Sequence, residues 1–195
     1  MLVTDDRLVA GRDLIALARS AVRGGVTSVQ LRLKQASARE LLAVAEALRD
    51  GLTVPVLVND RPDVALVAGV GVHLGPEDVP VRLARRVLGG EAIVGASVGT
   101  VAEVERGQGA DYWGIGPWRT TGTKRDAGDA IGVEGFRAVV AWAEGRPCIA
   151  IGGVRPEDVP LVLGAGGVGV AVVSGLLGVE DVEGAARRYA EPFGG

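Results

Sequence analysis

The chain has 195 residues, which is enough for one domain with a large core and too few for two domains of ordinary size. Its net charge of −3 argues against nucleic acid or an anionic membrane as a partner, so an anionic ligand would have to be held by local positive charge. Hydrophobic residues make up 48% of the chain, but charged residues interrupt every segment, which excludes a membrane-spanning helix.

Eight short runs rich in β-branched residues recur along the chain, and we expect each to form a strand. Between them lie segments with apolar residues three and four positions apart, which predicts helices. Because the strands are apolar on both faces, they predict a parallel sheet covered by helices. Eight such units predict a (β/α)8 TIM barrel as a single compact domain over residues 1–195, with an open doubly wound sheet as the alternative. The runs are residues 2–4, 28–31, 54–58, 70–74, 92–96, 112–115, 148–151 and 168–173.

Polar residues, charged residues and glycines gather just after nearly every expected strand. In a (β/α)8 barrel these positions share one face, where the loops after the strands form the active site. The pattern therefore predicts an enzyme. The positions are Arg32, Lys34, Asn59, Asp60, Asp78, Ser97, Gly152, Gly153, Ser174, Gly175 and a threonine-rich loop at 120–125.

Two of these loops are suited to phosphate. Thr121, Thr123 and Lys124 supply hydroxyls and a positive charge on backbone that Gly122 leaves free to bend, although a solvated surface loop is the alternative. Glycines follow the seventh and eighth strands, where many barrels hold a phosphate, and ordinary tight turns are the alternative there.

Two carboxylates and three polar side chains predict a magnesium diphosphate site. Asp60 and Asp78 follow adjacent strands and fit Mg²⁺, although helix capping also explains Asp78. Gln30, Arg32 and Lys34 alternate with leucines, so all three point to one side of the extended chain, where a diphosphate would be a partner. The only histidine, His73, lies at a strand end and is expected to be a hydrogen-bonded core residue.

The start of the chain and its cysteine content predict a cytoplasmic protein. Residues 1–6 lack a basic region followed by an apolar stretch, so we expect no signal peptide. Cys148 is the only cysteine and lies in an apolar run, so we expect a buried, unreactive thiol. A homo-oligomer is compatible with the sequence.

Taken in chain order, these motifs resemble the thiamine-phosphate synthase family, whose members are (β/α)8 enzymes. The family joins an aminopyrimidine methyl diphosphate to a thiazole phosphate and releases diphosphate, by a dissociative reaction. The matching segments are Val29-Gln30-Leu31-Arg32-Leu33-Lys34, Val58-Asn59-Asp60-Arg61, Gly71-Val72-His73-Leu74-Gly75-Pro76-Glu77-Asp78, Gly95-Ala96-Ser97, Ala110-Asp111-Tyr112, Thr121-Gly122-Thr123-Lys124, Ala150-Ile151-Gly152-Gly153-Val154 and Val172-Val173-Ser174.

The resemblance implies a role for each matching residue. The residues implied to hold the pyrimidine diphosphate are Gln30, Arg32, Lys34, Asn59, Ser97 and Lys124, of which Arg32, Ser97 and Lys124 would take part in catalysis. Asp60 and Asp78 would ligate Mg²⁺, the implied cofactor. The thiazole phosphate would contact Thr121, Gly122, Thr123, Gly153, Val173 and Ser174.

Two departures from the family pattern stand out. The family usually has an acidic residue before Gly-Val-His, where this chain has Gly69-Val70-Gly71, and it usually has a small apolar residue and Phe-Pro where this chain has Trp118-Arg119-Thr120. The alternatives are a thiazole tautomerase of the same fold, whose histidine near the sixth strand is missing here, and a non-catalytic thiamine-phosphate-binding protein.

Overall fold

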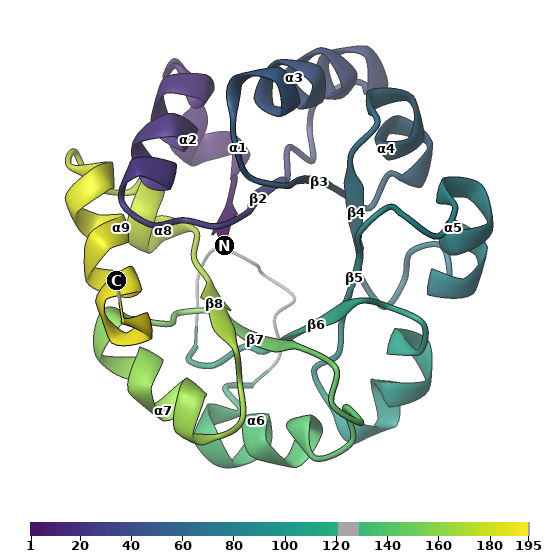
Figure 1. The fold of residues 1–195 in the computed structure, drawn as a ribbon, viewed down its shortest axis with the longest axis vertical. Helices are drawn as coiled ribbons and strands as arrows, with labels where there is room; N and C mark the ends of the chain where they lie inside the picture. The colour runs from purple at the N-terminus through teal and green to yellow at the C-terminus, as the bar shows by residue number, and fades with distance from the viewer. Residues whose placement is uncertain (121–128, 195) are drawn as a thin grey trace.

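The structure, a computed structural model, describes residues 1–120 and 129–194 and contains eight parallel strands. Each strand pairs with the next along the chain, so the sheet order is the sequence order. Figure 1 looks down this ring of strands, with the helices outside it. The strands are β1 (Leu2–Val3), β2 (Val29–Leu31), β3 (Val56–Asn59), β4 (Gly71–Leu74), β5 (Val94–Ser97), β6 (Tyr112–Ile115), β7 (Cys148–Ile151) and β8 (Gly169–Ala171).

The sheet closes between its first and last strands. Leu2 forms a parallel bridge with Val172, next to the end of β8. The amide of Val3 donates to the carbonyl of Val172 at 2.9 Å, and the amide of Val172 donates to the carbonyl of Met1 at 3.0 Å. These bonds make a barrel and exclude the open doubly wound sheet, which the strand count had left as an alternative. The predicted (β/α)8 fold is confirmed.

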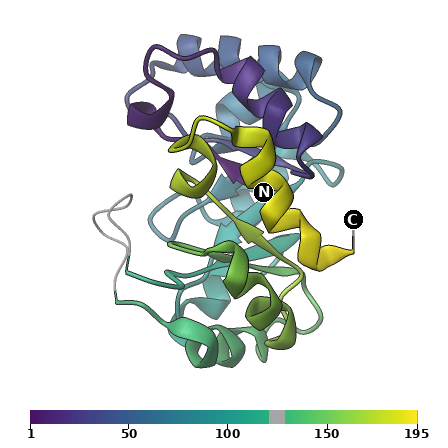
Figure 2. The ribbon, with the colours of Figure 1, turned by 90° about the vertical axis from the view of Figure 1, so that its left-hand side faces the viewer.

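Helices follow the strands and cover the outside of the barrel (Figures 1 and 2). α2 and α9 lie side by side, joined by an ion pair of 2.8 Å between Arg23 and Glu183, so the ring of helices closes between its first and last long helices. The helices are α1 (Asp6–Val9), α2 (Leu14–Arg23), α3 (Ala38–Gly51), α4 (Pro62–Ala68), α5 (Val81–Leu88), α6 (Gly132–Val140), α7 (Val159–Gly164), α8 (Ser174–Leu177) and α9 (Val182–Ala190), with 3-10 turns at η1 (Val101–Gly107), η2 (Pro156–Asp158) and η3 (Glu191–Phe193).

Helix α3 shows how the sequence sets one of these elements. Ser37 caps its first turn and exchanges hydrogen bonds with Glu40, an arrangement that satisfies backbone N–H groups at the helix start. Leu41, Ala45 and Leu48 are spaced by four and three residues, so they fall on one face and are buried against the barrel.

The segment after β5 differs from the expected helix. It forms the 3-10 turn η1, where the carboxylate of Glu103 accepts the amide N–H groups of Gly99 at 2.6 Å and Thr100 at 3.2 Å. The indole of Trp113 then donates to the carbonyl of Gly107 at 2.8 Å and holds the end of the turn against β6. Trp113 is therefore a core residue.

Buried polar side chains mark where the barrel departs from a purely apolar core. Within the described residues, the buried polar or charged side chains are Thr4, Gln30, His73 and Asp158. A buried polar group is costly without a hydrogen-bond partner, and the structure gives each of these four at least one. Gln30 and His73 lie within β2 and β4, Thr4 directly follows β1, and Asp158 lies in η2 after β7. No described helix is long and apolar enough to cross a membrane.

Candidate active site

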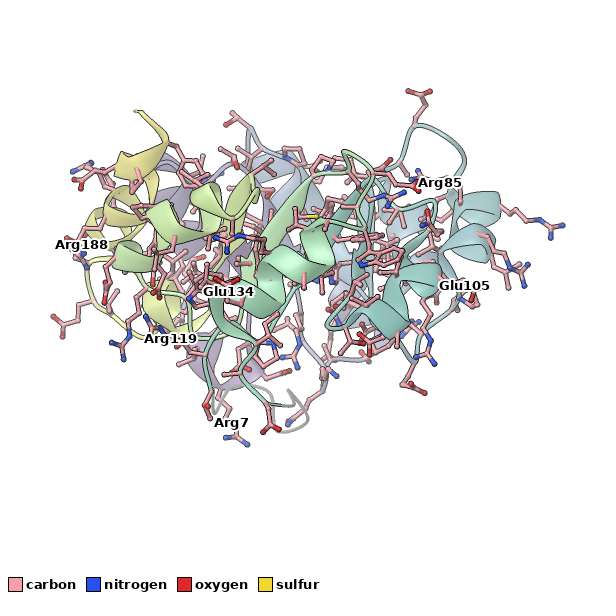
Figure 3. All side chains as sticks on the ribbon, turned by 90° about the horizontal axis from the view of Figure 1, so that it is seen from below. Arg7, Arg85, Glu105, Arg119, Glu134 and Arg188 are labelled. Carbon is pink, nitrogen blue, oxygen red and sulfur yellow. The ribbon has the colours of Figure 1, made fainter. Side chains whose placement is uncertain are left out.

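The site residues expected from the sequence lie at the carboxyl ends of β2 to β5 and in the loops that follow. Gln30 lies within β2, with Arg32 and Lys34 just beyond it, and Asn59 and Ser97 end β3 and β5. Arg7 and Arg119, which follow β1 and β6, lie on the same lower side of the molecule in Figure 3, away from Arg85. This is the face on which (β/α)8 enzymes carry their chemistry.

Gln30 and Asn59 form the inner wall of the site. Gln30 is 3% exposed, and its Nε2 donates to Oδ1 of Asn59 at 3.1 Å. This bond joins neighbouring strands β2 and β3 and fixes the orientation of both amides. All three residues of β2 are buried, and exposure then rises along the chain, to 17% for the Arg32 side chain and 53% for the Lys34 side chain at the rim.

Asp60 and Asp78 form a close pair of acidic residues. Burial, followed by the hydrogen bond and the negative charge of Asp78, raises the pKa of Asp60 to about 6, although Lys34 and Arg32 oppose the shift. Lys34 Nζ lies 4.0 Å from Oδ2 of Asp60, and Asp78 Oδ2 accepts the amide of Gly75 at 2.6 Å. Burial and the neighbouring Asp78 therefore make Asp60 harder to ionise than an ordinary aspartate.

The backbone of Asp60 is held in an uncommon conformation. Its φ is +65°, a region that few residues other than glycine adopt, although aspartate and asparagine tolerate it best. The amide of Asp60 donates to the carbonyl of His73 at 2.9 Å, which anchors this conformation to β4. Residues in such conformations cluster at functional sites, where the surrounding structure holds them in place.

The acidic pair fits a divalent cation in its donor chemistry. Carboxylate oxygens are the ligands that Mg²⁺ prefers, and a cation between them would offset the negative charge of Asp78, which adds to burial in raising the pKa of Asp60. No group of three or more His, Cys, Asp or Glu side chains within the described residues could hold a metal. A Mg²⁺ ion at Asp60 and Asp78 would thus take further ligands from water and substrate, as it commonly does.

Ser97 is connected to the barrel interior through His73. Ser97 Oγ lies 3.0 Å from Nε2 of His73, and Nδ1 of the same ring lies 2.8 Å from the hydroxyl of Tyr112. His73 is 7% exposed, which agrees with the expectation of a hydrogen-bonded core histidine. Burial raises the pKa of Tyr112 well above its usual range, so its hydroxyl stays protonated. The hydrogen bonds from Tyr112 to His73 and from His73 to Ser97 fix the position of the Ser97 hydroxyl.

Gly152 and Gly153 form the turn after β7, with φ of +91° and +70°. The amide of Arg119 donates to the carbonyl of Gly152 at 2.8 Å, so the segments after β6 and β7 lie side by side. A Cβ on Gly153 would lie 2.9 Å from Cβ of Arg119, which leaves no room for a side chain. Val173 and Ser174 begin α8 after β8, the next strand round the barrel.

Four of the expected site residues, Thr121, Gly122, Thr123 and Lys124, lie outside the described residues. Trp118, which precedes them, is 4% exposed and packs edge-on against Phe136 with ring centroids 5.7 Å apart. It is a packing residue. Cys148 is also buried, and burial raises the pKa of its thiol to about 11, so it is a poor nucleophile at neutral pH.

Sequence reasoning missed Thr4, Asp5 and Asp6, which follow β1. Thr4 accepts the amide of Arg32 at 2.7 Å, Asp5 lies 3.6 Å from the Arg32 guanidinium, and Asp6 accepts the amide of Lys34 at 3.0 Å. Their position directly after the first expected strand was the available signal, and it matches the rule that picked out the other site residues.

Comparisons with known proteins agree with this arrangement. The sequence model of the family described as thiamine monophosphate synthase matches residues 1–176. The thiamine-phosphate synthase of Moorella thermoacetica is 44% identical over 97% of this chain and 93% of its own length, and that of Xanthobacter autotrophicus is 48% identical over 95% and 90%.

Two solved structures match the whole fold of the chain. The thiamine phosphate pyrophosphorylase from Pyrococcus furiosus matches with a TM-score of 0.86 and 36% identity, covering 100% of this chain and 96% of its own. A 3-hexulose-6-phosphate synthase matches with a TM-score of 0.70 at 18% identity, over 97% of this chain and 98% of its own, and shares the fold alone. The chain belongs to the thiamine monophosphate synthase family.

Proposed function

We propose that this enzyme joins 4-amino-2-methyl-5-(diphosphooxymethyl)pyrimidine to thiazole phosphate, forming thiamine phosphate and releasing diphosphate. Family membership supports this reaction. One feature of the chain itself also supports it. Two cations, Arg32 and Lys34, stand beside the acidic pair Asp60 and Asp78 at the carboxyl end of the barrel. Opposite charges gathered in this way suit a magnesium-bound diphosphate, in which metal and anion each need a partner.

The pyrimidine diphosphate would occupy the β2 to β5 side of the site. Arg32 and Lys34 would bind the phosphate oxygens, and the buried Gln30 and Asn59 would offer amide groups to the polar edges of the pyrimidine ring. Ser97, held by His73, would add a hydroxyl at the next strand. Lys124 is included from the sequence alone.

Mg²⁺ held by Asp60 and Asp78 would neutralise negative charge on the diphosphate. The chain's own cations would act in the same direction, since charge on the leaving diphosphate grows as the carbon–oxygen bond breaks. Preorganised cations stabilise that charge without having to reorganise during the reaction. The chemistry needs no protein nucleophile, in keeping with the buried, poorly ionising thiol of Cys148.

The thiazole phosphate would bind on the β6 to β8 side. Gly153, Val173 and Ser174 would present backbone N–H groups to its phosphate, because the positive φ of Gly153 turns the backbone outward with no side chain in the way. Thr121, Gly122 and Thr123 would complete the contacts. The two half-sites would then hold the thiazole nitrogen and the pyrimidine methylene carbon within reach of each other.

Two other functions use parts of the same site. A thiazole tautomerase would act on thiazole phosphate alone, but the only histidine of the chain, His73, is buried against Ser97 and Tyr112. A protein that only binds thiamine phosphate would not need two metal-binding carboxylates beside the cations. Neither function accounts for Asp60 and Asp78.

A turnover assay distinguishes these functions. Purified protein is incubated with both substrates and Mg²⁺, and thiamine phosphate and diphosphate are measured by chromatography. We expect equal amounts of both products, and none when either substrate or Mg²⁺ is omitted. Isomerisation of the thiazole phosphate without the pyrimidine would support the tautomerase instead, and binding without product would support the non-catalytic protein.

A further inference from the structure

Three consecutive residues after β1 hold three different parts of the segment after β2. The hydroxyl of Thr4, which is fully buried, accepts the amide of Arg32 at 2.7 Å and donates to its carbonyl at 3.1 Å. Asp6 accepts the amides of Lys34 at 3.0 Å and Gln35 at 3.1 Å, one on each carboxylate oxygen. The backbone that carries both cations is therefore fixed from β1.

Asp5 holds the side chain of Arg32. Its Oδ1 accepts the amide of Arg7 at 3.1 Å and caps α1, while its Oδ2 lies 3.6 Å from Nη1 of Arg32. The Asp5 and Arg32 side chains are only 14% and 17% exposed, so water screens this ion pair less than it screens a surface pair. A guanidinium has five N–H donors, so contact at one nitrogen leaves the others for a ligand.

We propose that Asp5 is a positioning residue that orients Arg32 toward the diphosphate, and that Asp6 does the same for the turn that carries Lys34. The proposal rests on the proposed function, because it takes the diphosphate as the ligand of Arg32. An arginine that is already oriented loses less conformational freedom when an anion binds, so the anion binds more tightly.

The opposite expectation follows from charge alone. A carboxylate beside an anion site repels the anion, so its removal would tighten diphosphate binding if Asp5 only contributed charge. Positioning predicts weaker binding after the same change. The sign of the effect therefore separates the two roles.

Asp5→Asn is the informative variant. Asparagine is as good a helix cap as aspartate and keeps an oxygen for the amide of Arg7, but it loses the charge that attracts Arg32. Asp13→Asn is the matched control, because Asp13 caps α2 by accepting the amide of Ala16 at 3.0 Å and undergoes the same change of charge.

Calorimetry measures the binding of inorganic diphosphate with Mg²⁺ to the unmodified protein and to both variants. We expect Asp5→Asn to weaken diphosphate binding about tenfold, as loss of a preorganised cation would. Its KM for the pyrimidine should rise and its KM for the thiazole phosphate should stay unchanged. Asp13→Asn should match the unmodified protein. In an Arg32→Ala background, Asp5→Asn should no longer weaken binding, because the residue it positions is gone and only the loss of a repelling charge remains.

Asp6 provides an independent measurement. Asp6→Asn keeps one acceptor oxygen where two amides need one each, so diphosphate binding should weaken here too. Tighter or unchanged binding in Asp5→Asn, or an equal effect with and without Arg32, would overturn the positioning role alone. Failure of the unmodified protein to bind diphosphate would overturn both this role and the proposed function.

Discussion

Arg119 donates two hydrogen bonds to the carboxylate of Asp158, from Nε at 3.0 Å and from Nη2, and so joins the segment after β6 to η2, which follows β7. Asp158 is 1% exposed, and it also accepts the amide of Arg155 at 2.9 Å. Arg119 belongs to the tripeptide that departs from the family pattern. Arg119 is thus paired with a buried carboxylate, and its amide donates to the carbonyl of Gly152 at 2.8 Å, so the pair lies beside the Gly152–Gly153 turn.

We expect Arg119→Ala to destabilise the protein at neutral pH, because it leaves a buried carboxylate without its cation. Burial opposes ionisation of Asp158, but the hydrogen bonds from Arg119 and Arg155 outweigh it and hold the pKa of Asp158 below its usual range. A depressed carboxyl pKa stabilises the fold above the unfolded value of about 4, and this contribution is lost as the pH falls through the folded value.

Thermal unfolding at several pH values tests this expectation. The midpoint of Arg119→Ala should lie furthest below that of the unmodified protein near pH 7, and the gap should shrink in acid as Asp158 becomes protonated. Arg137→Ala is the control, since Arg137 forms an exposed pair with Glu134 on α6. A gap that does not change with pH would show that the ion pair is not the cause.

The acidic pair leads to a prediction with opposite effects on activity and stability. Asp60→Asn and Asp78→Asn should each lower turnover by about 10²-fold or more, with partial rescue by raised Mg²⁺, because each removes a charged ligand beside the leaving diphosphate. In the metal-free protein, Asp60→Asn should stabilise the fold by about 1–2 kcal/mol after allowance for screening, since it removes a carboxylate whose pKa is raised by burial and by the neighbouring Asp78.

Activity assays across a Mg²⁺ series, and urea unfolding with and without Mg²⁺, check both parts. Asparagine also tolerates the φ of +65° at position 60, so the variant keeps the backbone. Asp63→Asn serves as the control, because the carboxylate of Asp63 pairs with Arg61 on the surface of α4. Normal turnover of either site variant at ordinary Mg²⁺ would remove the metal from Asp60 and Asp78.

The strands and their order could be predicted because parallel strands buried on both faces leave a strong apolar pattern. The expected ranges for β6 and β7 agree with the structure, and β8 is shorter by one residue at its start and two at its end, where Val172 forms only the bridge to Leu2 and Val173 caps α8. Closure of the barrel was not predictable, because it depends on the Leu2–Val172 bridge between residues far apart in the sequence.

The candidate site was predictable where a residue follows a strand and carries charge, as for Arg32 and Asp60. The contacts that hold those residues in place could not be predicted from the sequence. The Arg119–Asp158 pair spans 39 residues and the Thr4–Arg32 bond spans 28, so no local pattern connects the partners. Asp5 also looks like an ordinary helix cap, which it is, and its second oxygen reaches Arg32 only in the folded barrel.

Lys124 lies outside the described residues, and its role is predicted from the sequence. If it contacts the leaving diphosphate, Lys124→Ala should lower kcat by about 10- to 10³-fold, roughly 1.4–4 kcal/mol, with a smaller change in pyrimidine affinity. Single-turnover kinetics report the bond-breaking rate directly. Arg125→Ala, one position along, is the control for loss of any cation from this loop. An unchanged rate in Lys124→Ala would leave that lysine as a surface charge.

Gly153 tests the thiazole half of the site. Gly153→Ala places a Cβ 2.9 Å from Cβ of Arg119 on backbone with φ of +70°, so the turn must shift. If backbone amides at this turn bind the thiazole phosphate, the KM for that substrate should rise about 10- to 100-fold while the KM for the pyrimidine changes much less.

Gly166→Ala separates this effect from strain alone. Gly166 has a φ of +90° and a Cβ there would lie 3.0 Å from Cγ1 of Val140, so the substitution costs a similar conformational strain. It lies between α7 and β8, at the opposite end of the barrel from the site. Gly166→Ala should therefore lower the unfolding temperature as Gly153→Ala does and leave both KM values unchanged. Equal increases of both KM values in Gly153→Ala would mean that the thiazole phosphate binds elsewhere in the barrel.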